Sequence, residues 1–150
     1  MRATIRKLRR ALVTIAGGLA LVVCVSVGCN AVDEFLDTDD APPSGVDCYS
    51  SFESFKGAMR RAGKQLPRDQ EWHHIVNQNP TNTRRFPKRL HCTDNLIALP
   101  TNIHRQVSGH YSSKQDWSRP KTVREVVSAM SWDEQHTYGL RLLRRYRITP

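Results

Sequence analysis

The hydrophobic positions of the chain fall into one long uncharged segment and a series of short apolar runs. Residues 11–28 contain no charged side chain and directly follow a strongly basic stretch, residues 1–10. As a helix, the uncharged segment would be about 27 Å long, close to the hydrocarbon thickness of a bilayer. Basic residues before it and acidic residues after it favour translocation of the C-terminal part. We therefore expect residues 1–29 to be an export signal or a retained membrane anchor.

The end of this segment carries a candidate lipidation site at Cys29. The stretch Ser26-Val27-Gly28-Cys29 is similar to the processing site of bacterial lipoproteins, because a small residue precedes the cysteine. Ser26 stands where that pattern prefers leucine, so lipidation, ordinary cleavage and a plain anchor all remain open. These outcomes predict a bacterial protein that is associated with the membrane on its outer side or secreted.

Residues 30–47 have the composition of a flexible linker. They contain six acidic side chains and no lysine or arginine, with Pro42-Pro43-Ser44-Gly45 near the end. Such a segment cannot bury enough apolar surface to fold by itself. We expect it to hold the folded domain, residues 48–150, away from the membrane.

The hydrophobic pattern of residues 48–150 predicts an α+β domain. Large apolar side chains recur at spacings of three and four over residues 50–62, which indicates a helix. Two more helices are expected beyond Pro120. The second of these should begin at the capping box that Ser131 and Glu134 provide.

Two short strand-like runs lie between these helices. Residues 72–78 form the first run and residues 95–99 the second, with a polar, basic loop over residues 79–89 between them. A helix over about residues 102–112 should follow, with Thr101 as its N-cap. The predicted order is therefore strand, basic loop, strand, helix.

The charge of the domain points to an anionic partner. Residues 48–150 hold 18 basic and 8 acidic side chains, a net charge of +10, within a whole chain of +9. A surface this basic favours nucleic acid or a phospholipid surface. A basic surface that only keeps the domain soluble explains the charge equally well.

Two of the four cysteines, Cys48 and Cys92, lie in the predicted domain. The chain has no C-x-x-C pair, so a zinc knuckle is not expected. Export would allow a disulfide between Cys48 and Cys92. Two free thiols are equally compatible with the sequence.

Three histidines form the candidate chemistry of the domain. His73 and His74 are adjacent in the first strand-like run, and His104 lies in the first turn of the helix after the second. Phosphodiester hydrolysis needs a base for the attacking water, for which histidine is suited near neutral pH, and neutralisation of developing negative charge, which a divalent metal can provide. Adjacent strand residues point to opposite faces, so His73 and His74 share a cleft only where a bulge or twist redirects one of them.

These residues occur in an order that resembles the HNH nucleases of the endonuclease VII-like, or His-Me finger, group. The similarity is greatest to the WHH-type nuclease modules at the ends of bacterial polymorphic toxins. It rests on Trp72-His73-His74-Ile75-Val76, Asn95-Leu96-Ile97-Ala98-Leu99 and His104, with nine residues from Asn95 to His104. The resemblance covers roughly residues 50–146 and implies a ββα-metal finger embedded among helices.

The resemblance implies a role for each of four residues. His74 matches the general base, and His73 and His104 match metal ligands. Asn95 matches the finger asparagine, which positions the base or joins the metal shell. The implied cofactor is one divalent ion, Mg²⁺ first, although Zn²⁺, Ni²⁺ or Mn²⁺ also suits histidine ligands.

The implied activity is endonucleolytic cleavage of nucleic acid, DNA more than RNA. The toxin resemblance adds an immunity protein as a candidate partner. Basic loop and helix residues are candidates for contacts to the phosphate backbone. These nucleic-acid-binding candidates are Arg84, Arg85, Lys88, Arg89, His110 and Lys114.

One departure from the toxin pattern supports an alternative function. The pattern usually has an acidic residue soon after the paired histidines, and this chain has Asn77 there. The alternative is a membrane-anchored module that binds nucleic acid on the same scaffold without cutting it. His91, like His110, could contact phosphate, although a plain surface histidine is the more common case, and His136 is expected to be structural.

Overall fold

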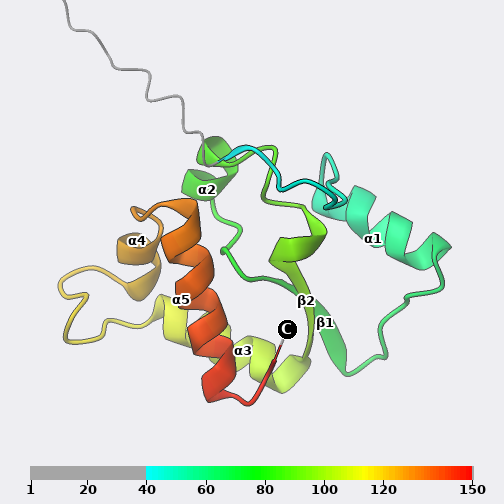
Figure 1. Ribbon diagram of the computed structural model, residues 1–150. Helices are drawn as coiled ribbons and strands as arrows, with labels where there is room; N and C mark the ends of the chain where they lie inside the picture. Colours follow the sequence, from blue (N-terminus) through cyan, green and yellow to red (C-terminus); the bar gives the residue numbers. More distant parts are fainter. Residues whose placement is uncertain (1–39, 150) are drawn as a thin grey trace, which may run out of the picture. The chain divides into compact units, whose positions relative to one another are not determined.

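The computed structural model describes residues 40–149 (Figure 1). The elements are α1 (Phe52–Arg61), β1 (Gln70–His74), α2 (Pro80–Arg85), the short 3₁₀ helix η2 (Thr93–Asn95), β2 (Leu96–Pro100), α3 (Thr101–Ser112), α4 (Val123–Val127) and α5 (Trp132–Arg145). Helices combined with one small antiparallel sheet make the domain α+β, as the sequence predicts.

The predictions for the N-terminal part concern residues outside this range. The signal or anchor at residues 1–29, lipidation of Cys29 and the linker up to residue 39 all lie outside the described residues. Within residues 40–149, no helix is both long enough and apolar enough to cross a membrane.

The sheet consists of β1 and β2, paired antiparallel. Gln70 lies opposite Pro100, and the pairing continues without interruption to His74 opposite Leu96. The first strand is thus displaced from its predicted range, because residues 75–78 leave the sheet. The Ile75 amide still donates to the Asn95 carbonyl at 2.9 Å, one step beyond the last strand pair.

The predicted loop between the strands contains a helix, so the loop prediction for residues 79–89 is wrong in part. Asn79 caps α2: its side-chain oxygen accepts from the amides of Thr81 and Asn82 at 2.9 and 3.1 Å. Pro80 occupies the first turn, where its missing N–H costs no hydrogen bond. The Asn-Pro pair reads as a turn signal, but here it starts a helix.

The other helices begin and end as their sequences suggest, with one exception. Ser51 caps α1, and Ser131 with Glu134 forms the predicted capping box of α5. Helix α3 begins at Thr101, which lies inside the helix and is not its N-cap; Pro100 takes that place without a side-chain hydrogen bond. A second capping box, from Thr122 and Glu125, starts α4.

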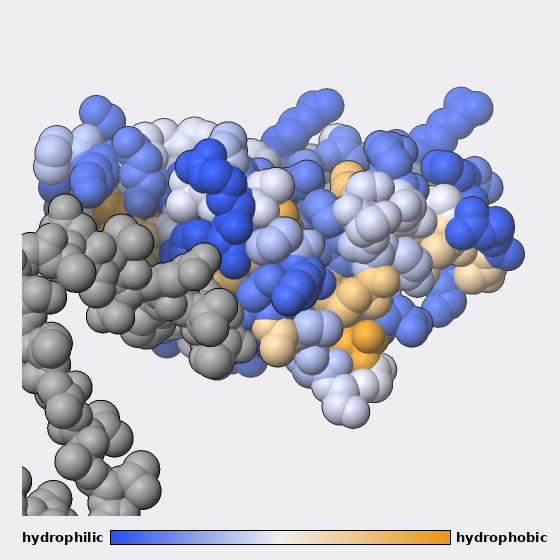
Figure 2. All heavy atoms as spheres, turned by 90° about the horizontal axis from the view of Figure 1, so that it is seen from above, coloured by the Kyte–Doolittle hydropathy of each residue, from blue (hydrophilic) through white to orange (hydrophobic). Residues whose placement is uncertain are grey.

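The hydrophobic core has two parts. The larger part joins the residue after β1 to β2 and to helices α3, α4 and α5. Its fully or nearly fully buried members are Ile75, Leu99, Val107, Tyr111, Val123, Val127, Leu142 and Leu143. The smaller part comprises Val76, Phe86, Leu90 and Trp132. Figure 2 shows a largely hydrophilic face with small separate hydrophobic patches.

Helix α5 lies unusually close to the segment that leaves β1. Gly139 on α5 faces Ile75, and a Cβ atom at Gly139 would lie 2.8 Å from Ile75 Cγ2 and still closer to the Ile75 carbonyl oxygen. Any residue with a Cβ atom at position 139 would force α5 or the Ile75 main chain to move, so only glycine fits here. The contact fixes α5 against the residue that follows the two adjacent histidines.

A disulfide joins Cys48 to Cys92. The neighbouring main chain is tied at two further points: the Tyr49 amide donates to the His91 carbonyl at 3.3 Å, and the Thr93 amide donates to the Asp47 carbonyl at 2.9 Å. The crosslink therefore connects the segment before α1 to the segment that carries His91. Of the two alternatives that the sequence left open, the structure has the disulfide.

Candidate functional site

His73 and His104 lie side by side in the structure. Helix α3 starts directly after β2, which brings His104 over the face of β1 that carries Glu71 and His73. The ring centroids of His73 and His104 are 5.2 Å apart, with their planes at 73°. His104 Nδ1 lies 2.6 Å from Glu71 Oε2. A carboxylate and two imidazoles thus meet on one face of the sheet.

His74 contacts a different set of residues. Its Nε2 atom is 3.1 Å from Nδ1 of His91, and its ring lies 4.7 Å from the ring of Phe52 on α1. The strand pairing is regular, so no bulge in β1 turns the two adjacent histidines to one face. The four histidines therefore form two pairs, His73 with His104 and His74 with His91.

Burial keeps the two central imidazoles neutral. His73 is 4% exposed and His74 is 6% exposed. Burial, together with repulsion from His104, lowers the pKa of His73 to about 4. Burial, with repulsion from His91, His73 and His104, lowers the pKa of His74 to about 3.

Asn95 is fully buried and binds only main-chain atoms within the described residues. Its side-chain oxygen accepts from the Val76 amide at 2.7 Å. Its amide nitrogen donates to the carbonyls of Leu90 and Val76 at 2.9 and 3.3 Å. These hydrogen bonds hold the segment after His74 against the segment before His91. Both polar atoms of the Asn95 side chain are thus engaged with the main chain.

His73 and His104 are the two residues of this site that could hold a metal ion. Two imidazoles that share a tetrahedral ion at roughly 2.05 Å have ring centroids about 5 Å apart, close to the observed separation. The Glu71 carboxylate accepts from Nδ1 of His104, which leaves Nε2 as the available lone pair; metal-binding histidines commonly make this kind of contact. Across residues 40–149, no group of three or more His, Cys, Asp or Glu side chains is arranged to hold a metal.

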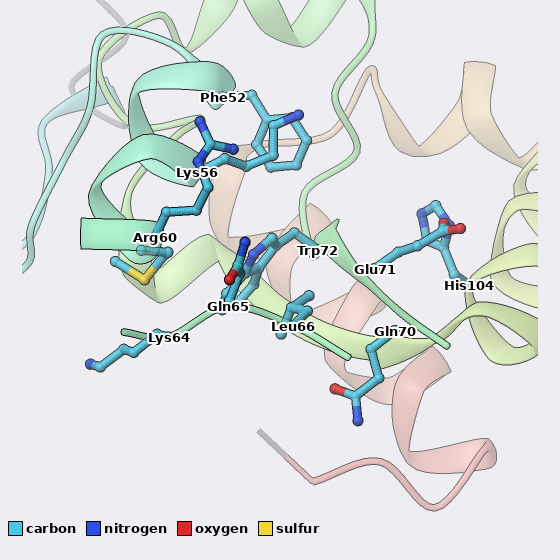
Figure 3. A pocket seen from close by; sticks show the side chains of 11 residues that line it. Phe52, Lys56, Arg60, Lys64, Gln65, Leu66, Gln70, Glu71, Trp72 and His104 are labelled. Atoms are coloured by element: carbon cyan, nitrogen blue, oxygen red, sulfur yellow. The ribbon is translucent and has the colours of Figure 1, made fainter. Parts of the chain in front are cut away.

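A cavity of about 430 Å³ opens beside this site, between α1 and β1 (Figure 3). Basic side chains of α1 line one end, and Glu71 and His104 face each other at the other end. Trp72 and Leu66 lie between them. The histidine site therefore borders a hollow that is open to solvent.

The predicted nucleic-acid contacts are dispersed over the domain. Arg85 donates to the carbonyls of Ser128 and Met130, both at 2.9 Å, and Arg89 lies over the Trp132 ring at 4.6 Å. Arg85 thus joins α2 to the connection between α4 and α5, and Arg89 joins the turn after α2 to α5. Arg84, Lys88 and Lys114 are exposed.

His110 is also engaged within the domain. Its Nε2 atom lies 2.7 Å from the hydroxyl of Tyr138 on α5, and the two rings are stacked. This contact ties α3 to α5. His136, expected to be structural, has its Nε2 atom 3.3 Å from the Asp94 carbonyl.

Two residues of the site are not evident from the sequence pattern. His91 is 8% exposed and contacts His74, so the expectation of a surface histidine is wrong. Glu71 is an exposed strand residue with no motif of its own. Its position two residues before His73, on the same strand face, is the only signal that could have identified it.

Comparison of the chain with known protein families, with curated proteins and with solved structures found no match.

Proposed function

We propose that residues 48–150 form a metal-dependent endonuclease of the HNH type, exported or membrane-tethered in a bacterium and related in role to toxin modules. The observation that supports this most is the meeting of His73, His104 and Glu71 beside the His74–His91 pair. Glu71, His73 and His74 lie on β1, His104 lies on α3, and His91 lies in the segment between α2 and η2. The order β1, β2, α3 is the order that a ββα-metal finger requires.

His73 and His104 are the proposed ligands of a divalent metal. Both are imidazoles whose separation fits a shared ion, and the low pKa of His73 keeps its lone pair available at neutral pH. When bound, the metal would supply positive charge for the phosphate and the leaving oxygen. Mg²⁺ is the proposed ion in the cell, and histidine ligands also suit Mn²⁺, Ni²⁺ and Zn²⁺.

His74 is the proposed base that takes a proton from the attacking water. At neutral pH both His74 and His91 are neutral, so one ring donates and the other accepts in their hydrogen bond. A proton taken up at His74 would be shared with His91 across this contact. Asn95 keeps the two segments that carry these rings together.

The substrate is proposed to be DNA in preference to RNA, bound through its phosphates with little choice of sequence. The domain's charge of +10 and the exposed Arg84, Lys88 and Lys114 favour such binding. An immunity protein that covers the site is a proposed partner for a chain of this kind.

Plasmid nicking tests the activity. The full-length wild-type protein should convert supercoiled plasmid to the nicked form with Mg²⁺ or Mn²⁺, and a chelator should abolish the conversion. His74→Ala should lower the rate at least about a hundredfold, as loss of a general base does. His136→Ala is the matched control and should retain wild-type rate. Equal rates for wild type and His74→Ala would exclude His74 from catalysis.

A binding module without nuclease activity is the second candidate. Asn77 stands in place of the acidic residue of the toxin pattern, and its side-chain oxygen accepts from Arg124 at 3.0 Å instead of facing a histidine. This candidate predicts salt-dependent binding of nucleic acid with no cleavage under any metal. Chelator-sensitive cleavage by the wild-type chain would dismiss it.

A further inference from the structure

The cavity between α1 and β1 has a chemical character that the histidines do not explain. One wall comes from α1 and the turn after it, and the other from β1 and the start of α3. Its volume of about 430 Å³ falls in the range of small-molecule sites. Because Glu71 and His104 belong to its lining, whatever occupies the cavity lies next to the proposed metal ligands.

The interior of the cavity is aromatic and apolar. Trp72 and Phe52 line it, together with Met59 and Leu66. Phe55 packs edge-on against Trp72, with ring centroids 4.9 Å apart, so the indole is held from behind while it remains part of the lining. A fixed, accessible indole is a surface on which a nucleobase can stack.

The rim of the cavity is cationic. Lys56, Arg60 and Lys64 line it, and Glu71, the single acidic member of the lining, is engaged by His104. Lys56 pairs with Glu53 and lies over the Phe52 ring. Within residues 40–149, neither Arg60 nor Lys64 has an ion-pair partner. Figure 3 shows Lys56 and Arg60 extending from α1 on the side opposite His104.

We propose that this cavity binds one unpaired nucleotide of a single-stranded nucleic acid, with the base on Trp72 and the adjoining phosphate at Arg60 and Lys64. The neighbouring phosphodiester would then lie at His104. Paired bases are stacked inside a duplex and cannot enter. The cavity therefore takes a base only from a single-stranded segment or from a base pair that has opened, as base pairs do transiently in a supercoiled plasmid. This inference rests on the proposed nuclease function and names the form of substrate that the site takes.

Binding without cleavage tests the proposal. The full-length His74→Ala protein, kept in chelator, is titrated into a fluorescein-labelled oligothymidylate and into a duplex of equal length, with anisotropy as the readout. The oligothymidylate should bind more tightly than the duplex. Arg60→Ala with Lys64→Ala should weaken oligothymidylate binding about tenfold and reduce the slope of log Kd against log salt by about 0.7, the value for one phosphate contact on a single strand.

Two further comparisons separate a specific cavity from general surface charge. Arg141→Ala with Arg144→Ala removes two exposed cations from α5 and should leave oligothymidylate binding within about twofold. Trp72→Leu should weaken binding at least about fivefold through lost stacking, and Trp72→Phe should restore most of it. Circular dichroism melting of each variant identifies any loss of folding.

Unchanged binding in the Arg60/Lys64 double variant, or equal losses in the α5 control, would overturn the proposal. So would duplex binding as tight as single-strand binding. A cavity that binds as predicted in a protein that never cleaves would refute the nuclease function alone. Cleavage that survives loss of the cavity contacts would refute the cavity alone.

Discussion

Single side chains decide the protonation state of the site. His73 and His74 are buried beside other imidazoles, and both effects oppose a positive charge. The Glu71 carboxylate, by contrast, lies at the edge of the site and contacts His104. The arrangement thus supplies neutral nitrogen atoms in its interior and carboxylate oxygens at its margin.

The lowered pKa values predict that the metal-free domain loses stability in acid. In the unfolded chain His73 titrates near its ordinary pKa of 6.5, and in the folded chain near 4. Between these values the unfolded state binds more protons, so stability falls as pH falls from about 7 to 4, by on the order of 3 kcal/mol for His73. His74 acts in the same direction and extends the loss toward pH 3.

Thermal melting in chelator at a series of pH values measures this loss. His73→Phe removes one titrating group, so its melting temperature should depend less steeply on pH than that of wild type. A wild-type melting temperature that stays constant from pH 7 to 4.5 would contradict the assigned burial.

Glu71 should affect metal affinity without binding the metal itself. Glu71→Ala removes the acceptor for His104 Nδ1 and should weaken Mn²⁺ binding about 10- to 100-fold, the usual effect of losing such a partner. Glu71→Gln keeps an acceptor oxygen for His104 Nδ1, so its Mn²⁺ affinity should fall less than that of Glu71→Ala. Isothermal titration with Mn²⁺ gives the affinities, with Asp116→Ala as an exposed carboxylate control. If Glu71→Ala and Asp116→Ala weaken Mn²⁺ binding equally, the effect comes from the general charge of the domain and not from the contact between Glu71 and His104.

At the scale of elements, the position of α5 is set by one glycine. Gly139 allows the helix to approach the main chain at Ile75, directly after the histidine pair. Asn82 and Gln135, both buried, hold the N-terminal part of the same helix to α2 through hydrogen bonds of 2.8 and 3.2 Å. Helix α5 therefore supports the segment that leaves β1 although it carries none of the proposed catalytic residues.

Gly139→Ala should destabilise the domain by about 1–3 kcal/mol, because the new methyl group meets the Ile75 main chain. Helix propensity alone would predict the opposite, a gain of up to about 1 kcal/mol. Gly109→Ala on α3 is the matched control, since nothing lies within 4 Å of its new Cβ atom, and it should show that gain. Urea unfolding of both variants measures the difference. Similar gains at both positions would mean that Gly139 does not lie against the Ile75 main chain.

Elements with strong local signals could be predicted from the sequence, and elements that depend on distant contacts could not. The capping box of α5 and the apolar spacing of α1 are local, and both helices were predicted correctly. Helix α2 has six residues, and its one buried side chain is the polar Asn82. The sequence therefore has no apolar periodicity there that would predict a helix. The range of β1 is set by its pairing with β2, which the sequence does not display.

The same distinction holds within the site. The order of His73, His74, Asn95 and His104 is visible in the sequence, and the structure brings His73 to His104. The partner of His74 depends on how the chain returns after α2, which places His91 within hydrogen-bonding distance. Strand geometry alone predicts that His73 and His74 diverge, and that is what their contacts show.

At the scale of the whole domain, the Cys48–Cys92 disulfide joins two regions that the helices do not connect. It links the start of the domain, next to α1, with the turn that carries His91. Helix α1 in turn contributes the Phe52 ring beside His74 and the basic rim of the cavity. Loss of the disulfide would therefore loosen the surroundings of both the His74–His91 pair and the cavity between α1 and β1.

Reduction should lower the stability of the domain by roughly 4 kcal/mol, the chain-entropy value for a loop that closes across 44 residues. Urea unfolding with and without a reducing agent measures the loss. Cys48→Ser with Cys92→Ser should match the reduced protein and should not respond to the agent further. If the urea midpoint of the wild-type protein is the same with and without the reducing agent, the disulfide adds no stability.

The crosslink also bears on the order of events in a cell that makes this chain. Cytoplasmic glutathione and thioredoxin keep cysteines as thiols, so a newly synthesised copy is expected to carry Cys48 and Cys92 unjoined. If the chain is exported, as proposed, oxidation would follow passage into the periplasm or beyond, and maturation would end there. The producer's own chromosome would then meet only immature copies.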